Sequence, residues 1–318
     1  MLVYSDNPKR FDGFFPSHAP WRKIAVNSGS EAETRLLEVL GCTGEIWSTR
    51  IDRTSTGFWS RVVAIAEAPW SQYDALQTLL QDENTLSEPA ACLALTGLGF
   101  HGQRGRPWKA EPGNLHLSVF LAPNRPVQEL IPALTMLPAV AVVAAIQKAT
   151  GDAIRPGIKW VNDILVDGGK VSGVLTTTQI KSRTVQACVL GIGVNLARAP
   201  EVAPTPFVPK TSCLADSGLA SRALELSNFF WILLGELENH YLHLLEKGPS
   251  DLFHRYVKAS LVIGRKVRIM PEIDTRAGAC HTSPEALAEG VVESISPDLS
   301  LKLDSQSETI SHGRLVLY

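Results

Sequence analysis

The chain has little cysteine, and its charges nearly cancel. The five cysteines are scattered among 318 residues, with no C-x-x-C pair and no histidine at metal-ligand spacing. Neither a disulfide framework nor a metal site is expected, and the thiols are predicted to be reduced and mostly packed. The sequence has 30 lysines and arginines and 32 aspartates and glutamates. It therefore lacks the positive net charge that favours nucleic-acid binding.

A long hydrophobic run is also missing from the sequence. The longest apolar stretch, LPAVAVVAAI at residues 137–146, is shorter than a bilayer span requires. The N-terminal residues MLVYSDNPKRFDGFFP carry neither the apolar core nor the cleavage pattern of a signal peptide. We therefore expect a cytoplasmic protein, with neither a membrane nor a nucleic acid among its partners.

The remaining composition is that of an ordinary globular protein, and its patterns divide the chain into three parts. Residues 1–60 contain one clear helix at about 31–40 and form an N-terminal extension. Residues 61–258 mix strands with helices, which predicts an α+β domain. Residues 259–318 contain short strands bounded by Gly, Pro or Asp, which predicts a small β-barrel. Strands are expected at 61–68, 91–96, 115–121 and 185–196, helices at 72–80, 131–150, 224–245 and 251–258, and an exposed loop at 273–285. The apolar and polar residues of 115–121 alternate with a period of two, which predicts a half-buried strand.

The segment KWVNDILVDGGKVSGVL, residues 159–175, is the most informative part of the chain. Its Asp-Gly-Gly turn lies between two apolar runs, which predicts a β-hairpin. The hairpin would bring Lys159, Asn162, Asp163 and Lys170 into one neighbourhood. Charged side chains are rarely buried unpaired, so this segment alone is consistent with a solvated hairpin edge.

Two further segments give the hairpin a functional context. One is GQRGRPW at 102–108, followed by GNLHLSVFL at 113–121, and the other is GIGVNL at 191–196. A glycine-rich loop is weak evidence by itself. In this order and spacing, the three segments resemble the biotin protein ligase family, with its G-R-G-R-x-G-R-x-W loop, K-W-P-N-D segment, G-K-K-x-x-G-I-L hairpin and G-I-G-I-N strand. The resemblance covers residues 60–318.

The resemblance implies both a fold and an activity. The fold is a mixed-sheet catalytic domain of the biotin/lipoate ligase type, followed by a small SH3-like β-barrel. The activity is ATP-dependent conversion of biotin to biotinyl-5′-adenylate, then transfer to a lysine of a biotin carboxyl carrier protein domain, in acetyl-CoA carboxylase or a related carboxylase. The substrates are ATP with Mg²⁺ and biotin. A homodimer is left open.

Some members of the family carry an N-terminal helix-turn-helix and act as repressors. Such a motif needs two consecutive helices and a positive recognition face. Residues 1–60 offer one acidic-leaning helix. No helix-turn-helix is therefore predicted.

The catalytic residues implied by the resemblance are Lys170, Asp163 and Arg104. Both steps of the reaction develop negative charge, so fixed cations and N–H donors are more useful than a nucleophilic side chain. Lys170 would reach the biotin carboxylate and the phosphoryl group joined to it. Asp163 would orient or deprotonate the incoming amine, or hold the Lys170 ammonium.

The resemblance also implies residues that bind biotin or the adenylate. Gly102 would present N–H groups to phosphate, while Arg104 and Arg106 supply positive charge. Trp108 would pack near the adenine or anchor the loop. Asn114 would fix the loop end or touch the adenine, and Asn162 would cap the hairpin or contact ribose or phosphate. The full expected set is His101, Gly102, Gln103, Arg106, Trp108, Asn114, Lys159, Asn162, Gly173, Gly191, Gly193 and Asn195.

The chain departs from the family pattern in the glycine-rich loop and before it. Two loop arginines are replaced by His101 and Gln103, and the glutamine before the loop falls at Gly97. The Ser-Thr-Asn motif that holds the polar ring of biotin falls at Pro69, Trp70 and Ser71. The ring would then be held by other groups, such as Trp70, Ser71, Thr96 or the backbone.

Three interpretations follow from these departures. The acid is biotin held by other groups, or it is lipoate or octanoate, or the chain is a non-catalytic cofactor-binding relative. The R-x-x-G-G-G-x-V-x-H loop typical of lipoyl ligases is missing, and Lys170 and GIGVNL are retained. A neutral Gln103 also gives weaker charge assistance than arginine, so the adenylate is expected to escape more readily.

Overall fold

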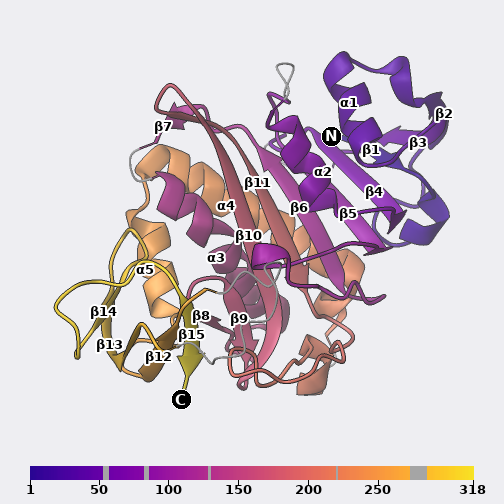
Figure 1. Ribbon diagram of the computed structural model, residues 1–318. Coiled ribbons are helices and arrows are strands. Elements are labelled where there is room, and N and C mark those ends of the chain that lie inside the picture. Colours follow the sequence, from indigo (N-terminus) through magenta and orange to yellow (C-terminus); the bar gives the residue numbers. More distant parts are fainter. Residues whose placement is uncertain (53–56, 82–85, 128–129, 220, 273–284) are drawn as a thin grey trace.

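The computed structural model describes residues 1–52, 57–81, 86–127, 130–219, 221–272 and 285–318. Within these residues, eleven strands form a large mixed sheet, and a smaller antiparallel sheet lies at the C-terminal end (Figure 1). The α+β class is therefore confirmed. The fifth cysteine, Cys280, lies outside the described residues, as does the predicted loop at 273–285 except for its last residue.

The large sheet has the order β2-β3-β1-β4-β5-β6-β11-β10-β9-β8, with β7 paired to β11. Strands β1, β4 and β5 run parallel, and the other pairs are antiparallel. Its strands are β1 (Leu2–Ser5), β2 (Arg22–Ala25), β3 (Glu45–Arg50), β4 (Arg61–Ala68), β5 (Ala90–Gly97), β6 (Leu115–Leu121), β7 (Arg125–Pro126), β8 (Gly157–Lys159), β9 (Asp163–Val166), β10 (Gly169–Lys181) and β11 (Thr184–Val194).

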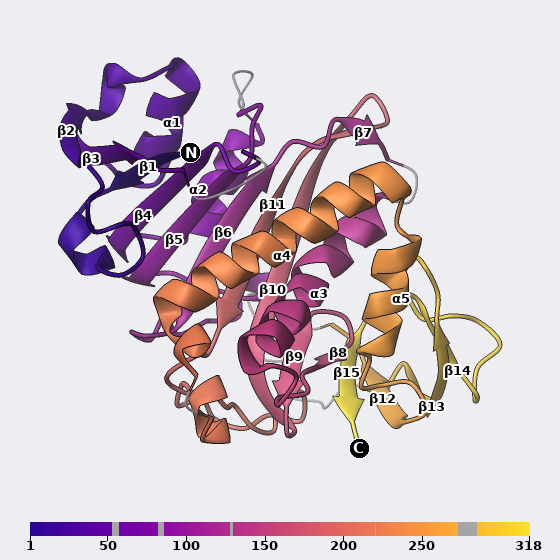
Figure 2. The same ribbon diagram turned by 180° about the vertical axis from the view of Figure 1, so that it is seen from behind.

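Helices cover both faces of this sheet (Figures 1 and 2). Helices α1 (Glu31–Val39) and α2 (Gln72–Leu79) pack on one face, and α3 (Leu130–Thr150) and α4 (Leu226–Lys247) on the other. Helix α5 (Ser250–Lys258) then leads to the small sheet. All five predicted helices are confirmed.

The N-terminal residues contribute strands that the sequence did not predict. Strand β1 pairs in parallel with β4 and antiparallel with β3, so the first residues extend the main sheet. These strands are short, and β2 (RKIA) is mostly exposed, so neither length nor alternation marked them. The helix beside them was predictable because Leu36, Leu37 and Leu40 share one face, and the structure adds a capping box of Ser30 and Glu33 at its start.

Strand β6 was predicted to be half-buried, and that prediction was wrong. All seven residues, Leu115–Leu121, are buried. Its leucines and Val119 face the core beneath α3 and α4, while His116, Ser118 and Phe120 lie on the face that carries α2. Alternation of apolar and polar residues along a strand indicates an exposed polar face only when no other part of the protein covers that face.

Helix α3 is apolar on most sides and lies between the sheet and α4. Pro138 inside it has no N–H to donate to the Leu134 carbonyl, and the Thr176 hydroxyl of β10 donates to that oxygen instead, at 3.2 Å. The helix is long and apolar enough to cross a membrane, so the length estimate from residues 137–146 was wrong. In its most apolar window, however, 72% of the residues are buried inside the molecule, as in a core helix.

The predicted hairpin is confirmed, and a side-chain hydrogen bond links the chain beside it to the small sheet. Strands β9 and β10 meet at a turn in which Asp167 and Gly168 have positive φ. The small sheet has the order β14-β13-β12-β15, with β12 (Lys266–Met270), β13 (Ala288–Ile295), β14 (Leu301–Leu303) and β15 (Arg314–Leu317). Trp160, beside the hairpin, donates from Nε1 to the Leu299 carbonyl at 2.8 Å, which ties the two sheets together.

Candidate active site

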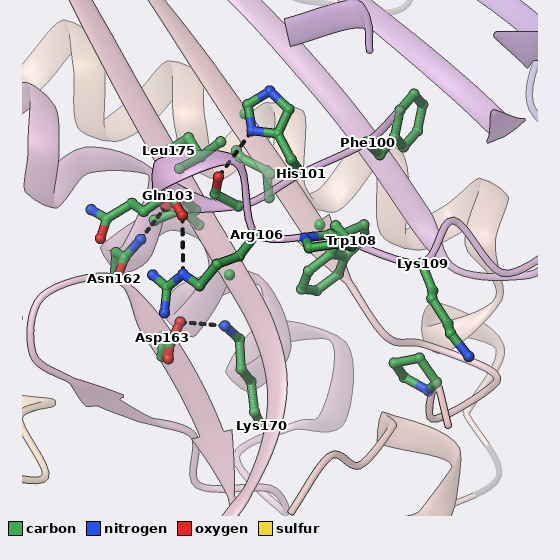
Figure 3. A pocket seen from close by; sticks show the side chains of 18 of the residues that line it. Phe100, His101, Gln103, Arg106, Trp108, Lys109, Asn162, Asp163, Lys170 and Leu175 are labelled. Atoms are coloured by element: carbon green, nitrogen blue, oxygen red, sulfur yellow. Dashed lines mark hydrogen bonds and ion pairs between the residues drawn. The ribbon is translucent and has the colours of Figure 1, made fainter. Parts of the chain in front are cut away.

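A cavity of about 360 Å³ lies over β10 and β11, beneath the glycine-rich loop and beside the start of α2 (Figure 3). The structure brings most of the predicted site residues to its walls. They are Ser71, His101, Gly102, Gln103, Arg106, Trp108, Asn162, Asp163, Lys170, Gly173, Gly191, Gly193 and Asn195.

Lys170 and Asp163 form an ion pair at one end of this cavity. The Lys170 Nζ lies 2.5 Å from the Asp163 carboxylate, and each side chain is 20% exposed (Figure 3). The backbone of Lys170 is held on its other side by Lys210 and Ser212. The pair is therefore placed by the hairpin and by a segment from beyond β11, which fixes the ammonium at the cavity wall.

Asn162 supports the same hairpin. Its Nδ2 donates to the Val174 carbonyl at 2.6 Å, and the Val174 N–H donates back to the Asn162 carbonyl at 3.1 Å. Of the two predicted roles, this geometry provides the capping one directly. The side chain still lines the cavity beside Asp163.

The glycine-rich loop closes on itself over the cavity. The Gly102 N–H donates to the Arg106 carbonyl at 2.7 Å, and the Trp108 N–H donates to the Phe100 carbonyl at 2.9 Å. The tip is a short 3₁₀ turn, Gln103–Gly105, in which Arg104 has a φ of 58°. Because the Gly102 N–H has a partner within the loop, it is not free for a phosphate in this conformation.

The two loop arginines point in different directions. Arg106 donates from Nε to the Gln103 carbonyl at 3.0 Å and faces the Lys170–Asp163 pair (Figure 3). Arg104 instead forms an ion pair with Glu272, which follows β12. It lines a second cavity of about 320 Å³ and not the first.

His101 pins the loop to α2. Its Nε2 lies 2.8 Å from the Asp74 carboxylate, and its Nδ1 lies 2.9 Å from the Gly102 carbonyl. The ring also makes an edge contact with Tyr73, whose hydroxyl is 2.6 Å from Thr177. His101 therefore binds a carboxylate of the protein itself.

Three glycines on β10 and β11 make room for the aromatic walls. A Cβ at Gly193 would overlap the Trp108 indole, and one at Gly191 would press on the Tyr73 ring. A Cβ at Gly173 would lie 3.3 Å from the Lys170 Nζ. These glycines were predicted to belong to the binding site, and they also let the Trp108 and Tyr73 rings pack closely against the strands.

His116 holds Trp108 in place and stays neutral. The Trp108 Nε1 donates to its Nδ1 at 3.4 Å, and its Nε2 lies 3.3 Å from the Glu111 carbonyl. Burial lowers the pKa of His116 to about 4. A neutral ring with its proton on Nε2 satisfies both contacts.

The other two predicted asparagines, Asn114 and Asn195, mainly hold the chain behind the cavity. Asn114 is fully buried and lies outside the cavity lining, and its Oδ1 accepts from the Ala197 and Arg198 N–H groups. Asn195 lines the cavity, and its Nδ2 donates to the Ser212 carbonyl. Of the two roles predicted for Asn114, the structure provides the one of fixing the loop end.

Three residues predicted near the biotin ring, Trp70, Thr96 and Gly97, do not line the cavity. Trp70 is 47% exposed, and its indole donates to the carbonyl of Val39, the last residue of α1. Gly97 packs tightly between Ala68 and Phe100. Ser71 does line the cavity, and its Oγ accepts from the Asp74 N–H as the cap of α2.

Lys159 and Arg314 face the second cavity, between the hairpin and the small sheet. Lys159 is almost fully buried and donates to the Phe207 carbonyl, and burial lowers its pKa to about 8. Arg314 of β15 borders both cavities, and its guanidinium stacks on the Phe207 ring, 3.4 Å from the ring centroid. Burial lowers the pKa of Arg314 to about 10.

Sequence reasoning missed several cavity residues. Arg314 gave no signal because it lies in the small sheet, far along the chain from the other motifs. The period-two pattern of residues 115–121 could have placed His116 and Ser118 on one face. The missed lining residues include Gln72, Tyr73, Phe100, His116, Ser118, Leu175 and Arg314.

The thiols of the described residues are packed inside the molecule, as the sequence predicts. The four described cysteines are free and buried, and burial raises the pKa of each. Within the described residues, no cluster of three or more His, Cys, Asp or Glu side chains could hold a metal ion.

Comparison with known proteins identifies the family. Residues 75–195 match the biotin/lipoate A/B protein ligase family. A biotin–[acetyl-CoA-carboxylase] ligase of Mycobacterium tuberculosis is 30% identical over 220 residues, which is 64% of this chain and 76% of that protein. The chain belongs to this ligase family.

Other members of the ligase family agree. The bifunctional ligase/repressor BirA of Bacillus subtilis is 32% identical over 168 residues, covering 52% of this chain and 50% of that protein. The chain thus spans about half the length of several curated relatives. The fold matches that of a biotin protein ligase from Aquifex aeolicus in complex with biotin and ATP, with a TM-score of 0.59, 18% identity and coverage of 81% and 98%.

Proposed function

We propose that this protein activates biotin with ATP and transfers it to a lysine of a biotin carboxyl carrier protein domain. The observation that carries the proposal is the Lys170–Asp163 pair at the end of a cavity, in a chain of the ligase family. Relatives named as biotin–[acetyl-CoA-carboxylase] ligases support the choice of acid and acceptor.

In the first step, a carboxylate oxygen of biotin attacks the α-phosphorus of ATP, and the bond to pyrophosphate breaks. Negative charge grows on the phosphate oxygens, so cations fixed before the reaction stabilise the transition state. Lys170 is placed to contact the carboxylate and the α-phosphate. Arg106 faces the same point from the loop.

In the second step, the lysine amine of the acceptor attacks the acyl carbon, and AMP leaves. The amine must lose a proton as the amide bond forms. The Asp163 carboxylate is placed to accept or orient that proton, and it also holds the Lys170 ammonium. To accept or to orient the proton, the carboxylate must lie within hydrogen-bond reach of the reacting amine nitrogen.

The second cavity is suited to the triphosphate. Lys159, Arg104, Arg106 and Arg314 surround it, with Asp163 and Glu272 as its carboxylates. ATP would enter as its magnesium complex, because Mg²⁺ is usually held by phosphates and only one or two carboxylates. Aromatic Trp108 is suited to the base or to the acyl chain, and the geometry is compatible with both.

We also propose the division into residues 1–60, 61–258 and 259–318, with a cytoplasmic location and a carboxylase subunit as partner. Strands β1–β3 make the first part an extension of the catalytic sheet. Escape of the adenylate past Gln103 stays a prediction. Sedimentation of the full chain would show whether it dimerises.

Pyrophosphate release tests the function directly. The full chain would be mixed with MgATP and biotin, lipoate or octanoate, in parallel. The expected result is that pyrophosphate is released with biotin but not with lipoate or octanoate, and that a carrier domain is then labelled. Preference for lipoate or octanoate would overturn the choice of acid, and no release with any of the three would favour a non-catalytic relative.

A further inference from the structure

Gln72 is a buried side chain with unused hydrogen-bonding capacity in the main cavity. It is the first residue of α2, it is 3% exposed, and it lines the cavity. Within the described residues, its Nε2 has no hydrogen-bond partner. A buried amide nitrogen without a partner costs free energy, so its presence at a cavity wall calls for a ligand atom.

Gln72 lies at the opposite end of the cavity from the ion pair. Along β10 the lining runs from Lys170 through Gly173 to Leu175, and Thr177 then bonds to Tyr73, the neighbour of Gln72. Figure 3 shows His101 and Leu175 at the end of the cavity far from Lys170. A carboxylic acid bound at Lys170 would therefore direct its distal end toward the start of α2.

The end of the cavity near Gln72 is closed by the loop. His101 reaches over to Asp74, two residues after Gln72, with 2.8 Å between the ring Nε2 and the carboxylate. The floor of the cavity at this end is formed by Gly191, which lies beneath the Tyr73 ring, and by Ser118 on β6. Gly191 and Ser118 are paired across β11 and β6. A hydrogen bond made here would be shielded from water, which makes a missing partner costly.

We infer that Gln72 selects the acid by hydrogen bonding to a polar head group, such as the cyclic urea of biotin. The inference rests on the proposed function and names the recognition element of that same site. A carboxamide offers a donor and an acceptor, and a cyclic urea offers both in return. Lipoate and octanoate offer no such atom at their distal ends, so they would leave the amide unpaired.

The test is calorimetric titration of biotin and of octanoate, without ATP, into the wild type and Gln72→Met. Methionine has a similar length and no amide. We expect the Kd for biotin to rise at least about tenfold, while octanoate binds the variant as well as or better than the wild type. The variant should keep its Tm, because the amide makes no hydrogen bond within the described protein.

Gln77→Met is the matched control, since Gln77 lies on the same helix and does not line the cavity. It should leave biotin affinity unchanged. Biotin bound equally by the wild type and Gln72→Met, or not bound by the wild type, would overturn the inference.

Binding and turnover separate the two proposals. Wild type that binds biotin through Gln72 but releases no pyrophosphate would end the proposed ligase function and leave this inference standing. Wild type that turns biotin over, with Gln72→Met binding biotin as tightly as the wild type, would end the inference alone.

Discussion

At the scale of single residues, the site depends on charges that are placed before any ligand arrives. Lys170 and Asp163 are both partly buried, and each limits the movement of the other. Sequence reasoning could find this pair because a tight turn brings the two residues together across neighbouring strands. It could not find Gln72, whose significance lies in a missing hydrogen bond that only the fold reveals.

Lys170→Met should reduce kcat/KM for biotin-dependent pyrophosphate exchange by at least about a hundredfold, because the transition state loses a fixed cation. The rate at which labelled pyrophosphate is incorporated into ATP measures this loss of activity. Lys148→Met serves as control, since Lys148 lies exposed on α3 and pairs with Glu236. Near-normal exchange by Lys170→Met would remove Lys170 from the mechanism.

His116 should make the fold sensitive to acid. Its folded pKa of about 4 lies below the unfolded value of 6.5, so the unfolded chain binds more protons between these two pH values. Stability from this group is complete above pH 6.5 and falls as the pH drops toward 4. Urea unfolding should show a loss on the order of 2 kcal/mol between pH 7 and pH 5.

His116→Gln isolates this contribution, because glutamine does not titrate. Its stability should change less between pH 7 and pH 5 than that of the wild type. Equal losses in the two proteins would show that His116 does not cause the acid sensitivity.

At the scale of elements, the cavity is built where two glycine-bearing strands meet a loop. Gly173 and Gly193 are direct partners across β10 and β11, and Trp108 lies over them. The strands, the hairpin and the loop were predictable because their patterns are local. The packing of Trp108 on Gly193 was not, because it joins segments far apart in the sequence.

Gly193→Ala should displace Trp108, since the new methyl group would overlap the indole. Overpacking of this kind typically costs about 1–3 kcal/mol. We expect a lower Tm and a loss of ATP-dependent exchange. Gly235→Ala on α4 is the control, because nothing lies within 4 Å of its added Cβ, and it should be neutral or slightly stabilising. Identical behaviour of the two variants would contradict the packing argument.

At the scale of the whole molecule, the two sheets share one site. Arg314 and Glu272 come from the small sheet region, and both line the cavity that Arg104 and Lys159 enter. The Nε of Arg314 is buried without a hydrogen-bond partner in the described part of the chain. The small domain therefore supplies a cation to the proposed triphosphate site, which no local sequence pattern could indicate.

Arg314→Met should raise the KM for ATP at least about tenfold, because a charge facing phosphate is lost, and it should change biotin affinity less than the KM for ATP. Steady-state kinetics with ATP varied, together with biotin calorimetry, would measure the two effects. Arg268→Met is the control, since Arg268 lies on β12, lines neither cavity and pairs with Glu289. Equal KM values for ATP in Arg314→Met and the wild type would exclude Arg314 from the triphosphate site.

The buried position of α3 has a consequence for how the protein is made. The helix packs against β9, β10, β11, α4 and α5, and all of these follow it in the sequence. A ribosome adds roughly 5–20 residues per second, so α3, whose most apolar 18-residue window has a mean hydropathy of 2.0, is complete roughly 5–20 seconds before α4. During that interval the nascent chain exposes its most apolar helix. Its yield should therefore depend on chaperones that shield α3 until α4 has been synthesised.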